Sequence, residues 1–174
     1  ECGFVCTAHQ YKNGVCAICK AECPHANVDT STRVCSDCGL TMVAAVTVKG
    51  SESGSVTTYA ADLPAAMSAA EDGTKITLLA DVSIPRRTGI SGDGTTVTLD
   101  LNGHKITSGW LDVGAKDTNG TYTNCTLKII GKGSYEPPLY GGVITVNMKA
   151  TLDLSDWEGG TISSINISDN SNYD

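Results

Sequence analysis

From Met42 onward, apolar and polar residues alternate in short runs, which is typical of β-strands with one buried face. Two of these runs, at 46–48 and 56–59, lie on either side of the glycine-bounded turn at 50–54. Turn residues between two alternating runs predict a β-hairpin.

Only one segment has the spacing of a helix. Apolar residues recur there at positions i, i+3, i+4 and i+7, namely Leu63, Ala66, Met67 and Ala70. Asp62 is a good N-cap, Pro64 falls in the first turn, and the segment 71–73 ends the helix. Because the apolar face is small, we expect this helix to lie against a flat surface such as the end of a sheet.

After Gly73, short alternating runs bounded by Gly, Asn or Asp follow one another along the chain. They lie at 76–79, 97–101, 127–130, 143–146, 152–154 and 165–167. The step from Leu78 to Leu99 is about one β-helix coil, and repeats of about 20 residues are typical of solenoids. The longer step to Leu127 leaves room for an inserted loop. An antiparallel sandwich is the alternative, but the Asp-Gly and Asn-Gly pairs separate short strand corners rather than long hairpin arms, which favours the β-helix.

The first 40 residues carry two Cys-x-x-Cys pairs, each preceded by a shorter Cys/His pair. Three cysteines and one histidine are a ligand set of closed, tetrahedral zinc sites. We therefore predict two structural zinc ions, the first held by Cys6, His9, Cys16 and Cys19 and the second by Cys23, His25, Cys35 and Cys38. A disulfide framework is the alternative, but it would not require histidines at corresponding places.

The composition of the chain bears on its possible partners and on its domain organisation. The chain has 174 residues, a net charge of -7 and eight cysteines, seven of them in the first 40 residues. An acidic chain argues against nucleic acid as a partner, and no apolar run approaches the 18 residues or so that predict a membrane-spanning segment. Because so short a cysteine-rich segment usually needs metal to fold, we expect chelation to unfold residues 1–40 and to leave the rest largely intact.

The sequence also resembles a known family. The segments 59–82 and 99–106, which include Asp72-Gly73-Thr74 and Leu99-Asp-Leu-Asn-Gly-His104, are similar to the first coils of pectate-lyase-like right-handed β-helices. These occur in large surface proteins of anaerobic gut Gram-positive bacteria, often directly after Cys/His repeats. The resemblance implies a mostly β fold, in which a double zinc-binding module at 1–40 precedes the N-terminal part of a right-handed parallel β-helix at 41–174, with a capping helix. It also implies an extracellular location, on the cell surface or secreted.

We expect no catalytic residues in this chain. Asp100 and Asp153 occupy outward strand positions, where polar residues are usually solvated, and Arg86 and Arg87 read as a solvated corner. The motif around His104 predicts a structural turn, which Asn102 stabilises through its side chain. Cys125 reads as a buried free thiol. The alternative is the N-terminal part of a polysaccharide lyase or glycoside hydrolase.

Aromatic residues in the long connections are the candidates for ligand binding, because aromatic side chains on a rigid scaffold often contact sugars or proteins. They are Trp110, Tyr122, Tyr135, Tyr140 and Trp157. We expect the first four of them to form a flank built from the loops after Ile106 and Ile130. The sequence thus predicts a non-catalytic binding or presentation module whose partner is a host protein or a mucosal glycan. The resemblance adds immunoglobulin, since some surface proteins of this type bind antibodies.

Overall fold

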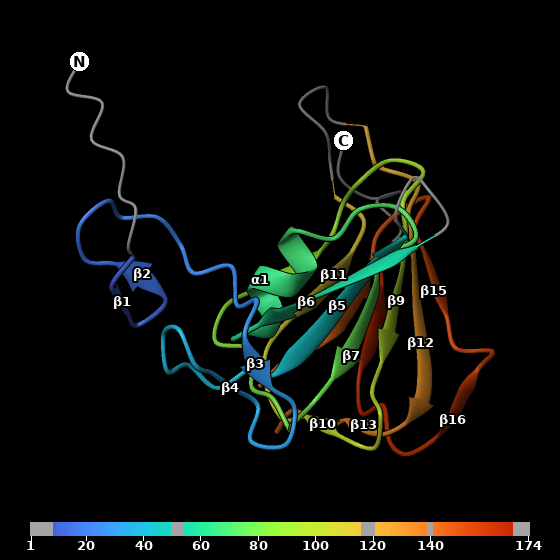
Figure 1. Cartoon of the computed structure of the whole chain (residues 1–174). Coiled ribbons are helices and arrows are strands. Elements are labelled where there is room, and N and C mark those ends of the chain that lie inside the picture. Colours follow the sequence, from blue (N-terminus) through green and yellow to red (C-terminus); the bar gives the residue numbers. More distant parts are fainter. Residues whose placement is uncertain (1–8, 50–53, 116–120, 139–140, 169–174) are drawn as a thin grey trace.

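A computed structural model describes residues 9–49, 54–115, 121–138 and 141–168 (Figure 1). Strands dominate this part of the chain, and its one α-helix, α1, covers only Leu63–Ser68. The prediction of a mostly β protein is therefore confirmed.

The N-terminal part consists of two small antiparallel hairpins. In the first, β1 (Tyr11–Lys12) pairs with β2 (Val15–Cys16), and in the second, β3 (Val28–Asp29) pairs with β4 (Val34–Cys35). We call residues 9–22 the first module and residues 23–41 the second module.

A longer hairpin and the helix follow. The strands β5 (Ala44–Lys49) and β6 (Ser55–Ala60) are paired antiparallel along their whole length, as the sequence predicts. The helix α1 begins after Asp62, whose side chain accepts a hydrogen bond of 2.6 Å from the backbone N–H of Ala65. Its buried residues, Leu63, Pro64, Ala66 and Met67, face the core. The predicted N-cap and helix are therefore confirmed.

The rest of the chain passes repeatedly through the same three stacks of parallel strands. The first stack contains β7 (Lys75–Leu78), β9 (Thr96–Asp100), β12 (Thr126–Lys132) and β15 (Thr151–Asp153), and β5 extends it by pairing antiparallel with β7. The second contains β8 (Thr88–Ile90), β11 (Leu111–Val113), β14 (Ile144–Val146) and β17 (Ile165–Ile167).

The third stack is the shortest. It pairs β10 (Lys105–Ile106) with β13 (Ser134–Tyr135), and parallel bridges from Val82 to Ile106 and from Tyr135 to Ile162 extend it by one coil at each end. The strand β16 (Trp157–Gly159) pairs with the end of β12. Ile76 pairs with Leu99 and Leu99 with Ile129, so the second turn of the chain is longer than the first. The extra length lies mainly between β11 and β12, where the sequence predicts an inserted loop. Parallel pairing throughout these stacks excludes the antiparallel sandwich.

The core lies between the stacks. Residues that pair across neighbouring strands form buried apolar rows, such as Ile76, Leu99 and Ile129 in the first stack. Because these apolar positions are buried against the strands above and below, each turn of the chain is stabilised mainly by its neighbours. In the second stack, Ile165 and Ile167 of β17 continue the rows but are exposed, since β17 is the outermost described strand there.

At some corners between the stacks, the backbones of successive turns of the chain lie too close together to leave room for a side chain. A Cβ atom on Gly142 would lie 1.7 Å from the backbone oxygen of Gly109, which itself has a φ of 105°. Glycine is the residue that tolerates both the positive φ and the close backbone contact.

Candidate metal centres and surface sites

The two modules repeat one local structure. In each, the second strand of a hairpin ends at the first cysteine of a Cys-x-x-Cys pair, at Cys16 and at Cys35. The carbonyl of that cysteine accepts a hydrogen bond from the N–H of the residue after the pair, at 3.1 Å from Lys20 and at 2.8 Å from Gly39. Both residues have positive φ, 64° and 74°. The chain therefore turns sharply around each pair, which directs both of its sulfur atoms to the same side.

The two modules also match after the turn, but the residues at the end of the matching segments differ in chemistry. The N–H of Cys23 donates to the carbonyl of Gly14, and the N–H of Met42 donates to that of Arg33, each at 2.7 Å. Met42 therefore follows the second module at the place where Cys23, a candidate ligand, follows the first. A buried apolar side chain thus ends the repeat where the β5–β6 hairpin begins.

The structure brings the predicted ligands together in two groups. The donor atoms of the second group, from Cys23, His25, Cys35 and Cys38, all lie within 4.8 Å of one another. Within it, His25 Nδ1 lies 3.4 Å from Cys38 Sγ, and the sulfur atoms of Cys23 and Cys35 are 3.8 Å apart.

The first group has the same form. The donor atoms of His9, Cys16 and Cys19 also lie within 4.8 Å of one another, with His9 Nδ1 at 3.3 Å from Cys19 Sγ. Its predicted fourth ligand, Cys6, lies outside the described residues. The six described cysteines are free thiols, so the disulfide alternative does not hold among Cys16, Cys19, Cys23, Cys35, Cys38 and Cys125.

The local electrostatics favour thiolate at one cysteine of each Cys-x-x-Cys pair. The backbone N–H of Cys19, helped by the His9 side chain, lowers the pKa of Cys16 to about 5 against the opposing effect of burial. Burial also opposes ionisation of Cys35, but hydrogen bonds from the N–H groups of Asp37 and Cys38 outweigh it and lower the pKa. Burial and the neighbouring thiols raise the pKa of Cys23 to about 12. Crowded thiolates repel one another, so a cation among them would be strongly favoured.

The second module is packed onto the strands that follow it. Cys23, Cys35 and Met42 form a buried cluster that side chains from beyond residue 41 cover, namely Tyr59, Ala61 and Leu79. The Arg33 side chain donates a 3.1 Å hydrogen bond from Nη1 to the carbonyl of Leu79. The predicted boundary after residue 40 therefore crosses a shared apolar cluster rather than a linker.

The aromatic candidates occupy different environments. Trp110 is 42% exposed at the connection before β11, and Trp157 is half-buried with its Nε1 donating to the carbonyl of Gly133 at 3.2 Å. Tyr140 lies outside the described residues. The prediction that Tyr135 contacts a ligand is wrong, because its side chain is only 1% exposed.

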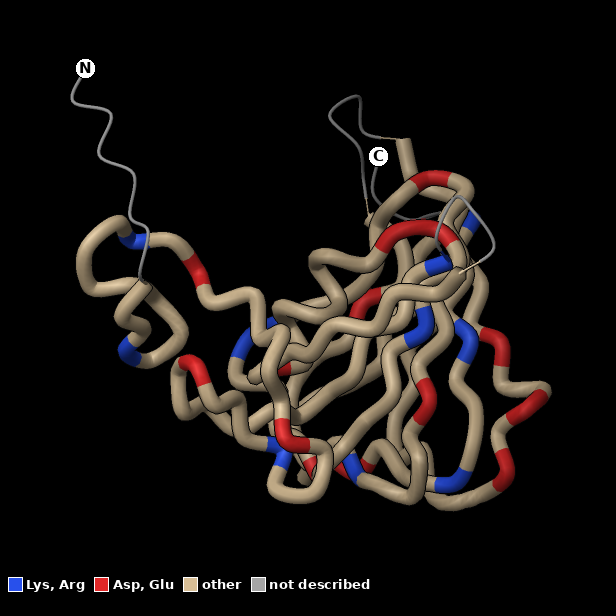
Figure 2. The backbone as a smooth tube through the Cα atoms, in the orientation of Figure 1, with Lys and Arg blue, Asp and Glu red and all other residues tan. Residues whose placement is uncertain are grey.

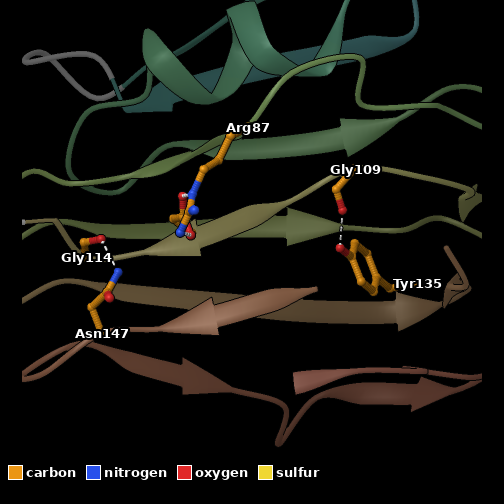
Figure 3. Close-up of polar contacts among 6 residues, drawn as sticks. Arg87, Gly109, Gly114, Tyr135 and Asn147 are labelled. Carbon is orange, nitrogen blue, oxygen red and sulfur yellow. Dashed lines mark hydrogen bonds and ion pairs between the residues drawn. The ribbon is translucent and has the colours of Figure 1, made fainter. Parts of the chain in front are cut away.

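Tyr135 belongs to β13 rather than to a loop, and its ring points into the core. Its hydroxyl donates a hydrogen bond to the carbonyl of Gly109 (Figure 3). Burial raises the pKa of Tyr135 to about 12. Tyr135 therefore holds neighbouring coils together.

Tyr122 lines a shallow pocket of about 580 Å³ at the connection between β11 and β12. The other lining residues are Asp93, Thr121, Thr123, Asn124 and Lys149. Asp93 Oδ1 accepts a 2.7 Å hydrogen bond from the N–H of Asn124, which fixes the carboxylate at the rim. Because Trp110 precedes β11 and Tyr122 follows it, the two lie at opposite ends of that strand. Of the residues predicted to form one flank, Tyr135 is thus buried in the core, while Trp110 and Tyr122 lie on either side of β11.

Opposite charges are interleaved over the strands (Figure 2). In the first stack, Lys75 pairs with Asp100 at 2.8 Å, and Lys128 pairs with Asp156 at 2.5 Å and with Asp153 at 3.9 Å. The bond to Asp156 raises the pKa of Lys128, and the N–H of Ser155 lowers the pKa of Asp153. Both shifts favour the charged forms of Lys128 and Asp153, whereas a carboxyl that acts as a general acid needs a raised pKa.

Three further residues were singled out in the sequence. Arg87 is exposed at the corner before β8, as the sequence predicts, and its guanidinium also binds both carboxylate oxygens of Asp112 (Figure 3). Asn102 Nδ2 donates to the carbonyl of Leu78 at 2.9 Å, which confirms its predicted role in the turn. Cys125 is buried, as predicted, and burial raises its pKa.

Comparison with family models, with curated proteins and with solved structures finds no match to this chain. Among the described residues, no helix has the length and apolar character needed to cross a membrane.

Proposed function

We propose that each Cys/His group holds one structural zinc ion. A tetrahedral site with Zn–S bonds near 2.3 Å and Zn–N bonds near 2.0 Å has ligand-to-ligand edges of roughly 3.5–3.8 Å. The sulfur–sulfur distance of 3.8 Å in the second group and the nitrogen–sulfur distances of 3.4 and 3.3 Å in the two groups are close to these edges. With Cys6 as the fourth ligand of the first group, each ion has four protein ligands and no open position for substrate.

The three stacks then form the N-terminal part of a right-handed parallel β-helix, with α1 as its cap. Successive strands of each stack are parallel and joined by a full turn of the chain, and such crossovers are right-handed in about 98% of cases. The packing of α1 beside β8, the outermost strand of the second stack on that side, supports its role as a cap.

On this scaffold we assign a non-catalytic, extracellular binding function, with a mucosal glycan as the ligand of the pocket at Tyr122. The observation that carries this assignment is the combination of an aromatic ring with Asp93, Asn124 and Lys149 around one shallow pocket. Pockets of a few hundred Å³ suit small ligands, and a sugar offers an apolar face to an aromatic ring and hydroxyl groups to polar side chains. The setting is a surface protein of a gut Gram-positive bacterium.

A host protein is the second candidate partner, and the exposed Trp110 favours it, because tryptophan is enriched among residues that anchor protein interfaces. Immunoglobulin is the host protein that the family resemblance suggests.

Binding of released mucin glycans to the zinc-loaded chain, measured on an array and then by calorimetry, tests the assignment. Tyr122→Ala is expected to weaken glycan binding at least tenfold, while Ile18→Ala, which truncates an exposed apolar residue of the first module, leaves it unchanged. Loss of immunoglobulin binding in Trp110→Ala, with no glycan bound by the parent chain, would transfer the function to the second candidate. Glycan cleavage by the parent chain would instead establish the lyase or hydrolase alternative.

A further inference from the structure

The strand β6 forms an edge of the largest sheet, next to β5. An edge strand presents unpaired backbone N–H and C=O groups, and proteins usually protect such edges with charges, proline or a bulge. The sequence of β6, Ser55–Ala60, contains no charged residue and no proline. Its pairing with β5 runs without a shift from Ala60 opposite Ala44 to Ser55 opposite Lys49. Within the described residues, β6 therefore lacks the usual protections of an edge.

A groove runs along this edge. Four consecutive residues line it, Thr58, Tyr59, Ala60 and Ala61. In a strand, successive side chains point to opposite faces of the sheet. Consecutive residues can line one groove only if the groove follows the backbone edge, so the free edge of β6 faces this space.

The groove has two further walls. Ala65 of α1 and Ala69 at its C-terminal end line the groove, and so does the turn Asn13-Gly14-Val15 of the first module. Its volume is about 790 Å³, within the range of about 300–1,000 Å³ that ligand pockets have. Small side chains line α1, so a single extended chain has room beside the edge.

Charge and exposure indicate which residues such a chain would carry. Glu22 and Asp62 line the groove against one arginine, Arg86, in a chain whose net charge is -7. This balance favours a basic residue in the partner. Val56, which is 60% exposed, extends the edge beyond the groove and offers an apolar contact. Backbone pairing along an exposed edge, with side chains giving specificity, is the known mode of β-strand addition.

We propose that β6 binds an extended segment of a partner protein, which adds as a further strand in this groove. The segment has alternating β-branched residues, to match the strand, and a basic residue near Glu22 or Asp62. This inference is independent of the glycan pocket, which is lined by residues that precede β9, β12 and β15 and shares none of them with the groove.

The probe is an N-acetylated, C-amidated peptide of sequence Thr-Val-Thr-Val-Thr-Lys, titrated into the isotope-labelled, zinc-loaded chain. We expect saturable NMR shift changes and slowed hydrogen exchange at the β6 amides. A control peptide with proline at each valine cannot pair, and a third with glutamate for lysine should bind several-fold more weakly. Equal responses to the proline peptide, or no response at β6 at millimolar concentration, would overturn the proposal.

Variants of the chain locate the site. Thr58→Lys places a charge on the edge and is expected to weaken the peptide at least tenfold, while Thr96→Lys, at an exposed position of the internal strand β9, leaves it unchanged. If Thr58→Lys fails to fold, Val56→Lys serves the same purpose at a more exposed position. Self-association of the chain without peptide, abolished by either edge variant, would show that the occupant is a second copy and would contradict the proposed partner.

Discussion

Replacing Met42 by alanine tests whether the second module and the stacked strands that follow it are one folded unit. Met42 is completely buried, its N–H donates to the carbonyl of Arg33, and its side chain lies in one cluster with Cys23 and Cys35. The same cluster contains Tyr59 of β6. A cavity at this position would therefore affect a metal group and the hairpin together.

The expected cost is about 2–5 kcal/mol, which is the range for truncation of a buried Leu, Ile or Met to alanine. Met148 provides a matched control, because its side chain is 41% exposed. Met148→Ala should change stability by no more than about 0.5 kcal/mol, as surface substitutions usually do. The difference between the two variants isolates the effect of burial.

Hydrogen exchange is the assay, combined with urea unfolding and with competition for zinc by a chelator. In Met42→Ala we expect faster exchange in β5, β6 and β7 as well as in 23–41, and earlier loss of zinc from the second group than from the first. The shared cluster also changes what chelation should do, since we now expect metal removal to loosen β5–β7 and not only residues 1–40.

Two results would refute this reasoning. One is a Met42→Ala protein that is no less stable than Met148→Ala. The other is faster exchange confined to residues 9–41, with β5–β7 as well protected as in the parent. Either result would mean that the boundary predicted after residue 40 is also an energetic boundary.

Two further predictions concern the coils. Tyr135→Phe removes the hydrogen bond to Gly109 and should cost about 1 kcal/mol, the usual net value for such a bond. Burial raises the pKa of Tyr135 from 10.0 to about 12, so its contribution is full below pH 10 and is lost as the pH rises through 12. The stability advantage of the parent over Tyr135→Phe should therefore shrink as the pH rises from 10 toward 12, and an advantage that does not change with pH would contradict this. Arg87→Ala removes a largely exposed ion pair with Asp112 and should cost at most about 1 kcal/mol in urea unfolding; a larger loss would show that the pair fixes the second stack.

Period-two alternation predicted the strands of the first stack well, because β7, β9 and β12 bury apolar residues at alternate positions. It missed β8 and β11, since Thr88-Gly-Ile90 and Leu111-Asp-Val113 are too short to show a period. Glycine and asparagine residues mark the turns in the sequence. Which strands pair with one another depends on how successive turns of the chain stack.

The ligand groups were predictable because their spacing is local, with each Cys-x-x-Cys pair on one turn. The burial of Tyr135 was not predictable, because Tyr135-Glu-Pro-Pro138 has the composition of a loop. Only the pairing of β13 with β10 turns its ring inward. The same holds for Met42, whose place in the repeat shows only from its hydrogen bond to Arg33. The free edge of β6 likewise depends on which strands the sheet leaves unpaired.

The central claim is tested most directly by measuring the metal content and the metal environment of one preparation of the chain. Elemental analysis gives the first and X-ray absorption the second. Two zinc ions per chain are predicted, each with about three sulfur neighbours near 2.3 Å and one nitrogen near 2.0 Å. Cys38→Ser should remove one ion and leave the first group filled. A chain that contains no zinc, or whose mass shows disulfides among these cysteines, would contradict the account.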